Sequence, residues 1–288
     1  MRVQPAAEAQ IEALSELAAV CQSDPQRHIA YVGVSATVIA AEIGDVDNWT
    51  DRTWTAWSGD RVVGWLLGET DPDLGRVWWW GPFVEHGSAW DQAADLLYDA
   101  AASGLAYPQE EMVSDSRSTI LAAFAERHGF HREEGSALLS LRDVSARRER
   151  HHVIRPMEES DREPVGILHD ELFPGTHTTG DRLVSLADGR RAILVARTER
   201  GIAGYVATEL QHDQSLYIDF LGVDPSARRR GLGSALVTAA IQEGLSRGAT
   251  WVHLSVRESN DPARALYRSL GFVEDRVLHP HRKGFSLA

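Results

Sequence analysis

The hydrophobic and polar positions repeat once along the chain. The segments LAAFAERHGFHREE (Leu121–Glu134) and ARALYRSLGFVEDR (Ala263–Arg276) each show an apolar helical period that ends in Gly-Phe and is followed by a charged, strand-like stretch. Gly129 and Gly271 suit the left-handed position that follows a helix. Upstream, VQPAAEAQIEAL and IRPMEESDREPV, about 150 residues apart, each read as a short strand that ends in proline before a helix. The pattern predicts two copies of one structural unit.

The same order of elements is expected in both halves. In the second half, a hairpin, a long strand, a helix, a strand, a helix and a last strand or pair of strands are predicted at residues 190–210, 215–223, 231–247, 250–256, 262–270 and 271–279. In the first half, a hairpin, a strand and two helices are predicted at residues 52–69, 75–84, 89–103 and 116–128. This order predicts an α/β fold in which each half forms a mixed, mostly antiparallel sheet flanked by helices.

A charged segment without apolar period, Arg142–His152, separates the two copies. We therefore expect a first domain at residues 1–145, a linker at 146–152 and a second domain at 153–288.

Composition narrows the class of protein. The chain has 288 residues, of which 43% are hydrophobic and 25% charged, and no apolar run is long enough to span a bilayer. The first twenty residues lack the continuous apolar core of a signal peptide, and the lone Cys21 suits a reducing compartment. A formal net charge of −13 argues against general nucleic-acid binding. We expect a cytoplasmic protein with no membrane or nucleic-acid partner, either a monomer or a homodimer.

Positive charge is concentrated at one loop of this acidic chain. A strand that ends at Val223 is followed by DPSA, then by the pattern Arg228-x-x-Gly231-x-Gly233, then by a helix. Backbone amides at such a helix N-terminus can bind an anion, the glycines let a phosphate approach the backbone, and the arginines supply charge. A dinucleotide-binding fingerprint would need glycine at Leu236, and a P-loop would need Gly-Lys-Ser/Thr. The loop predicts a site for another kind of phosphate ligand.

About thirty residues further on stands LSVRESNDPARALYRSLGF, Leu254–Phe272. The two segments at this distance resemble the GNAT superfamily of acyl-CoA-dependent N-acyltransferases. The resemblance implies acetyl-CoA as co-substrate, no metal, and a long strand that splays from the next strand to admit the pantetheine arm. The cofactor-binding residues that it implies are Leu221, Gly222, Val223, Arg228, Arg229, Arg230, Gly231, Leu232, Gly233, Ser234 and Asn260.

The same resemblance implies two catalytic roles. Tyr267, in the helix that we expect Asp261 to cap, matches the position of the acid that protonates the departing thiolate. A phenol of pKa about 10 can pass a proton to a thiolate whose conjugate acid lies near 8.5. Asp219 is the first candidate for the base, and alternation places it on the same strand face as Tyr217 and Leu221. Glu209 and His253 are the alternative bases.

The first half departs from this pattern. Aligning the Gly-Phe pairs puts Ala125 opposite Tyr267, while Asp91 and Ala93 fall near the loop glycines, with no arginine in front. We expect a degenerate copy. It carries eight of the nine tryptophans, which we assign mostly to core or domain-interface packing.

The acceptor is less defined by the sequence. The loop after the first helix of the second copy offers Phe173, Thr176 and His177 as contacts, together with Glu209, and net acidity favours a cationic amine. We expect a small-molecule or peptide amine. The tandem order with LGVDP and RRGLG is also similar to mycothiol synthase, which acetylates a cysteinyl amine. A non-catalytic acyl-CoA sensor and an interaction scaffold are the alternatives from other classes.

Overall fold

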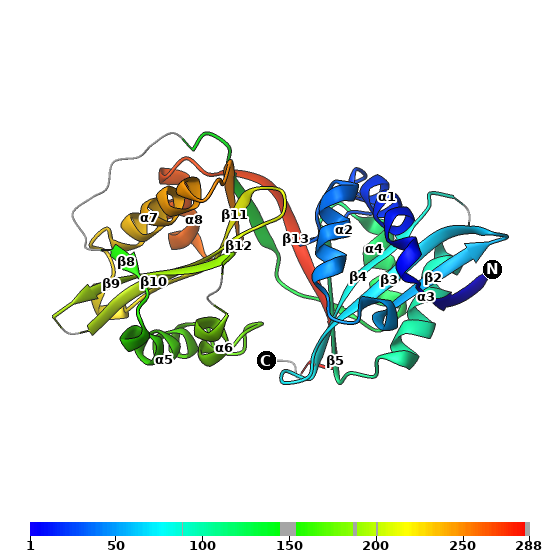
Figure 1. Cartoon of the computed structure of the whole chain (residues 1–288), viewed down its shortest axis with the longest axis horizontal. Helices are drawn as coiled ribbons and strands as arrows, with labels where there is room; N and C mark the ends of the chain where they lie inside the picture. Colours follow the sequence, from blue (N-terminus) through cyan, green and yellow to red (C-terminus); the bar gives the residue numbers. More distant parts are fainter. Residues whose placement is uncertain (88, 145–153, 187–188, 200, 286–288) are drawn as a thin grey trace. The chain divides into compact units, whose positions relative to one another are not determined.

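The computed structural model describes residues 1–87, 89–144, 154–186, 189–199 and 201–285 (Figure 1). The predicted linker at 146–152 lies outside the described residues. The chain forms two compact units: unit 1 consists of Met1–Ser136 with Arg276–Ala288, and unit 2 is Ala137–Asp275. Among the described residues, no helix combines the length and apolar character needed to cross a membrane.

Unit 1 contains a sheet with helices packed against it. In chain order its elements are β1 (Arg2–Pro5), α1 (Ile11–Gln22), α2 (Ala36–Asp45), β2 (Thr53–Ser58), β3 (Arg61–Asp71), β4 (Arg76–Val84), α3 (Trp90–Gly104), β5 (Gln109–Asp115), α4 (Thr119–Arg127), β6 (His131–Arg132) and most of β13 (Val273–Lys283). The strands lie in the order β1-β2-β3-β4-β5-β13. Only the β4–β5 pair among them is parallel.

Unit 2 repeats this order. Its elements are β7 (Ser136–Leu141), β8 (Ile154–Pro156), α5 (Arg162–Leu172), α6 (Gly180–Ser185), β9 (Arg191–Thr198), β10 (Gly201–Leu210), β11 (Ser215–Val223), α7 (Leu232–Ser246), β12 (Trp251–Arg257) and α8 (Asp261–Ser269). The strand order is β8-β9-β10-β11-β12-β7, and the central pair β11–β12 is parallel. The predicted α/β fold with two tandem units is confirmed.

The apolar periods explain which faces are buried. In unit 2, Leu216 and Ile218 of β11 pack with Leu236 and Ile241 of α7, whereas Phe220 packs with Val165 of α5 on the other face of the sheet. Figure 1 shows α5 and α6 on the opposite side of this sheet from α7 and α8. Each face of the sheet is therefore covered by helices.

Most of the tryptophans of unit 1 pack in or against its core, as predicted. Trp65, Trp79 and Trp90 are buried in its core, while Trp49, Trp54 and Trp80 are partly exposed and pack against that core. Trp57 and Trp78 are also partly exposed.

The two copies of the sequence repeat exchange their last strands. β7 precedes the linker in the sequence but lies beside β12, and its alternate residues Ala137, Leu139 and Leu141 are buried in the core of unit 2. At the other end of the chain, β13 pairs with β5 of unit 1 from Leu278↔Asp115 to Lys283↔Glu110. The units therefore do not divide the chain at a single point, because each sheet is completed by a strand from beyond the linker.

This exchange predicts the behaviour of a chain cut at the linker. With a protease site introduced at residues 146–152, the two fragments should co-elute after cleavage in size-exclusion chromatography. Each buried leucine of β7 contributes on the order of 2 kcal/mol to unit 2, so neither fragment should fold well when expressed alone. Two folded fragments that elute separately would contradict the exchange.

Candidate active site

The parallel strands β11 and β12 stop pairing part-way along their length. Their pairs run from Ser215↔Trp251 to Ile218↔Leu254, although β11 continues to Val223 and β12 to Arg257. We call Asp219–Val223 together with Ser255–Arg257 the fork of unit 2. On its other edge β11 stays paired with β10 as far as Val223. The N–H of Asp224 donates to the Ala203 carbonyl of β10, so the backbone groups of Asp224 face β10. Because backbone groups alternate in direction along a strand, those of Leu221 and Val223 face the fork.

A β-bulge gives Asp219 its position. Ala207 pairs with Phe220 and Thr208 with Ile218, which leaves Asp219 as the extra residue of β11. The predicted alternation is wrong at this point, because Leu221 packs on the α7 side while Tyr217 lies against His253 on the other side. The bulge inserts one residue and thereby reverses the alternation beyond it. The Asp219 carboxylate lies 3.4 Å from Nε2 of His177.

The arginine-containing loop ends in an open helix N-terminus. Gly231 adopts a left-handed conformation (φ +81°), and the first helical bond of α7 runs from the N–H of Ala235 to its carbonyl. The amides of the first turn, from Leu232 to Ser234, have no carbonyl behind them in the helix, as at every helix start. The α7 dipole adds partial positive charge at this end.

The three arginines of this loop are exposed. Arg228 donates from Nε to the Val223 carbonyl at 3.0 Å. Within the described parts of the chain, Arg228, Arg229 and Arg230 have no carboxylate within ion-pair distance. Their charge is therefore available to an anionic ligand at the start of α7.

Three glycines of the predicted site have different local reasons to be glycine. A Cβ on Gly231 would meet no atom within 4 Å, so only its positive φ requires glycine. A Cβ on Gly233 would lie 3.3 Å from Leu266, so its lack of a side chain also permits the packing of α7 against α8. A Cβ on Gly222 would lie 2.4 Å from the Tyr205 ring.

Tyr267 has a ring that is buried in unit 2. The ring lies in the core of unit 2, edge-on to Phe272 at 5.6 Å, and burial raises the pKa of the phenol. Among the described residues the hydroxyl makes no hydrogen bond. A protonated donor without a competing partner is suited to act on a bound ligand.

The cap of the helix that carries Tyr267 differs from the prediction. The side chain of Asn260 accepts from the N–H of Ala263 at 3.2 Å, so Asn260 is the N-cap and Asp261 the first helical residue. The amide nitrogen of Asn260 takes no part in this cap.

The predicted acceptor loop lies beside Asp219. His177 stacks on Phe220, with ring centroids 5.0 Å apart, and Phe173 contacts the same ring edge-on at 5.1 Å. The Thr176 hydroxyl donates to the Phe173 carbonyl at 3.1 Å, which ties the loop to the end of α5. The structure thus brings His177 next to Asp219, with Phe173 against the neighbouring Phe220 and Thr176 bonded within the same loop.

Two buried residues behind this group were not identified from the sequence. Nε2 of His169 lies 3.2 Å from the Thr178 carbonyl, and Nδ1 lies 2.7 Å from the Tyr205 hydroxyl. Because a carbonyl only accepts, Nε2 carries the proton and the tyrosine donates to Nδ1. Burial lowers the pKa of His169, which favours this neutral form. A histidine on the apolar face of α5 was the sequence signal for this bond.

The alternative bases are held by other groups. Glu209 forms ion pairs with Arg191 at 3.2 Å and Arg190 at 3.9 Å. Nε2 of His253 lies 2.9 Å from the Gln211 side chain, and burial lowers its pKa to about 4. Both residues lie where the strands are still paired, whereas Asp219 lies at the start of the fork.

Comparison with known proteins finds a family match within unit 2. Residues 157–272 match the model of the acetyltransferase (GNAT) family. This segment, less than half of the chain, is similar to the GNAT acetyltransferase family. The matched segment covers the fork, the arginine loop and Tyr267, and the first copy lies outside it.

Two curated relatives match about a third of the chain. The [ribosomal protein bS18]-alanine N-acetyltransferase of Escherichia coli (strain K12) is 39% identical over 90 residues, which are 31% of this chain and 60% of that enzyme. The mycothiol acetyltransferase of Clavibacter michiganensis subsp. michiganensis is 39% identical over 93 residues, which are 32% of this chain and 30% of that enzyme. The chain thus spans less than two thirds of each of these relatives.

Two solved structures share the GNAT fold over nearly the whole chain. A GCN5-related N-acetyltransferase from Sphaerobacter thermophilus has a TM-score of 0.78 at 18% identity and covers 98% of this chain and 95% of its own. A tandem GNAT protein from the clavulanic acid biosynthesis pathway has a TM-score of 0.70 at 16% identity and covers 100% and 99%. The tandem architecture therefore includes unit 1.

The glycine geometry predicts two stability effects of different size. Gly222→Ala places a methyl group against the rigid, buried Tyr205 ring and should lower the free energy of unfolding by about 1–3 kcal/mol. Gly231→Ala meets open space and should cost about 1 kcal/mol for its left-handed backbone. Chemical denaturation of both variants measures the difference. A Gly222→Ala protein as stable as the wild type would show that the ring is not fixed there.

Proposed function

We propose that unit 2 binds acetyl-CoA and transfers its acetyl group directly to the amine of a small molecule or peptide. The observation that carries this proposal is the fork between β11 and β12 next to an open helix N-terminus and three exposed arginines. A strand edge that lacks a partner suits an extended amide-containing arm, and a helix N-terminus with arginines suits a pyrophosphate.

The residues of the loop and the fork would divide the binding between them. Arg228–Arg230 and the amides from Gly231 to Ser234 would hold the phosphates. Backbone groups of Leu221 and Val223 would pair with the amides of the pantetheine arm. Gly222, the residue between them, packs against the Tyr205 ring. The amide nitrogen of Asn260 would face the same arm.

Asp219 and Tyr267 serve the chemistry from opposite faces of the sheet. Asp219, beside His177, accepts the proton that the amine nitrogen loses as its C–N bond to the acetyl carbon forms. The N–H of Leu221 donates to the oxygen that takes up the carbonyl electron pair. When the C–S bond breaks, the sulfur keeps the bonding pair and receives a proton from Tyr267. One proton leaves the amine and one reaches the thiol, so the transfer balances.

The surroundings of Asp219 favour an amine acceptor. The carboxylate stands at the fork with the aromatic rings of Phe173 and Phe220 nearby, and the chain is acidic as a whole. The two curated relatives are named for acetylating a ribosomal-protein alanine and for mycothiol acetylation, so a peptide N-terminus and a cysteinyl amine are the first acceptors to test. A non-catalytic acyl-CoA sensor would not need the unpartnered phenol of Tyr267.

The binding proposal predicts one acetyl-CoA site per chain. Gly231→Asp places a carboxylate at the start of α7 and should abolish binding in calorimetric titration with acetyl-CoA. Gly59→Asp is the matched control, because Gly59 also has a positive φ (+62°) in open space but lies in a hairpin turn of unit 1. It should leave the affinity unchanged. Equal affinity in Gly231→Asp and the wild type would refute the loop as the phosphate site.

The catalytic proposal predicts that binding and turnover separate in Tyr267→Phe. Because the variant keeps the ring and removes only the proton donor, kcat should fall about 10²- to 10⁴-fold while the Kd for acetyl-CoA stays within about twofold. The assay follows thiol release with an amine panel that includes an alanine-terminated peptide and a cysteine amide. A parallel loss of affinity and turnover would assign Tyr267 to binding instead.

A further inference from the structure

Unit 1 contains a fork of its own. The parallel pairs between β4 and β5 run from Arg76↔Gln109 to Trp78↔Glu111 and then stop, as the β11–β12 pairs do. Beyond this point β4 remains paired with β3 as far as Val84, and β5 with β13 as far as Asp115. We call Trp79–Val84 together with Met112–Asp115 the fork of unit 1.

Residues of the same unit lie along this fork. Ile29 forms an antiparallel bridge with Ser114, the N–H of Ala30 donates to the Val113 carbonyl at 2.9 Å, and the N–H of Asp115 donates to the His28 carbonyl at 3.4 Å. Because β13 already occupies the opposite edge of β5, these bonds lie on the edge that faces β4. Arg27–Ala30, which we call the inserted segment, therefore forms a short added strand in the fork.

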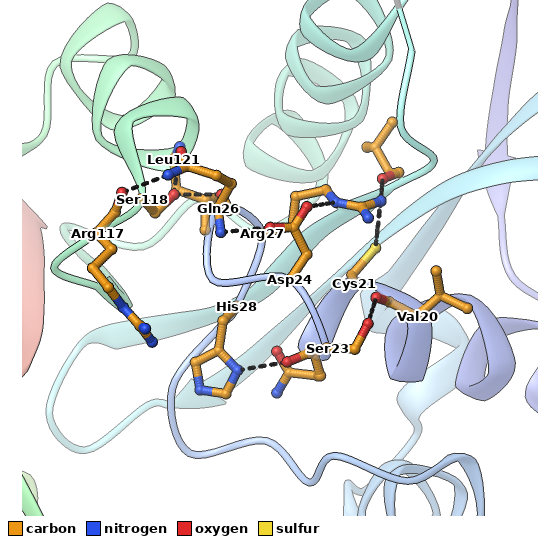
Figure 2. A network of polar contacts seen from close by, with 12 residues as sticks. Val20, Cys21, Ser23, Asp24, Gln26, Arg27, His28, Arg117, Ser118 and Leu121 are labelled. Carbon is orange, nitrogen blue, oxygen red and sulfur yellow. Dashed lines mark hydrogen bonds and ion pairs between the residues drawn. The ribbon is translucent and has the colours of Figure 1, made fainter. Parts of the chain in front are cut away.

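The inserted segment also reaches the other strand of the fork. Nη1 of Arg27 donates to the Val84 carbonyl at 3.3 Å, and the Cys21 thiol donates to the same carbonyl at 3.4 Å. Val84 ends β4 as Val223 ends β11. Figure 2 shows the Arg27 guanidinium next to the Cys21 sulfur, with Asp24 holding its other side at 2.9 Å. Both strands of the fork are thus bridged by the chain itself.

Two glutamines fix the inserted segment from both ends. The Gln22 side chain accepts from the N–H of Ile29 at 2.8 Å and donates to the Ile29 carbonyl at 2.9 Å. The Gln26 side chain donates to the Arg117 carbonyl at 2.7 Å and accepts from the N–H of Thr119 at 2.9 Å (Figure 2). The segment is therefore tied to α1 behind it and to the start of α4 in front.

Two differences between the copies explain the insertion. The loop after α1 runs from Ser23 to Ser35, whereas the loop after α5 runs only from Phe173 to Thr179 and holds His177 against Phe220. The longer loop has enough chain to enter the sheet. Counting back from the strand ends, Pro82 of β4 corresponds to Leu221 of β11, and proline has no N–H to offer a ligand.

We infer that the inserted segment Arg27–Ala30 is a built-in occupant of the fork of unit 1, which takes the chain's own peptide in place of an acyl-CoA arm. Unit 1 is then closed to acetyl-CoA by occupancy as well as by its missing arginine loop. Its sheet is complete without a ligand, because the free edge of β5 is paired by residues 28–30. This inference goes beyond the proposed function, since it holds whether or not unit 2 is an enzyme.

Cys21, the single cysteine of the chain, reports on the state of the segment. Its thiol is buried against Arg27, and burial raises its pKa to about 11, so it should react with a maleimide only when the segment opens. We expect Arg27→Met to speed labelling at least tenfold. Arg61→Met is the matched control, because Arg61 is an exposed arginine that pairs with Glu85, next to Val84. It should leave the rate unchanged.

Labelling of Gly231→Asp with and without millimolar acetyl-CoA tests the closure directly, because the site proposed for unit 2 is removed in that variant. We expect the same slow Cys21 labelling in both conditions and no heat of binding. A labelling rate that changes with acetyl-CoA would overturn the inference, since the ligand would then reach unit 1. Labelling of the wild type as fast as that of an exposed thiol would also overturn it. Absence of acetyl-CoA binding to the wild type would instead count against the proposed function alone.

Discussion

A pair of parallel strands that stops pairing half-way leaves backbone groups on both strands that need partners. In each unit the central parallel pair, β4–β5 or β11–β12, diverges after its first few residues while the outer edges stay paired. Buried N–H and C=O groups are costly without a partner, so such a fork has to be filled by water, by a ligand or by protein. The two units meet this requirement differently, and the functions proposed for them differ for that reason.

In unit 2 the surroundings of the fork suit a ligand. The α7 N-terminus and three arginines stand at one end, Tyr267 on one face and Asp219 with His177 on the other. In unit 1, Pro82 stands at the position of Leu221 and Ala125 at the position of Tyr267. The longer loop after α1 enters the sheet. A copy whose fork is filled in this way remains a folded unit without a ligand, and β13 completes its set of strands.

The features that depend on neighbouring residues could be predicted from the sequence. The repeat, the α/β order and the glycine–arginine loop before α7 are visible in short windows, because caps, turns and helical periods are set by neighbouring residues. The bulge at Asp219 depends on the pairing with β10, so alternation alone misplaced Leu221. The strand exchange and the inserted segment depend on partners far away in the chain. The length of the loop after α1 is the one sequence signal for the inserted segment. The choice between Asn260 and Asp261 as cap fell within one residue of the prediction, which is the usual uncertainty at a helix end.

Amide hydrogen exchange of the whole protein, followed with and without saturating acetyl-CoA, is the most direct test of the claim that a ligand fills one fork and the chain itself fills the other. The account predicts that acetyl-CoA slows exchange at Leu221, Val223 and the first turn of α7. It also predicts that the amides of Ala30 and Asp115, which are bonded across the fork of unit 1, exchange slowly in both conditions. Ligand-dependent protection in unit 1, or none at Leu221 and Val223, would contradict it.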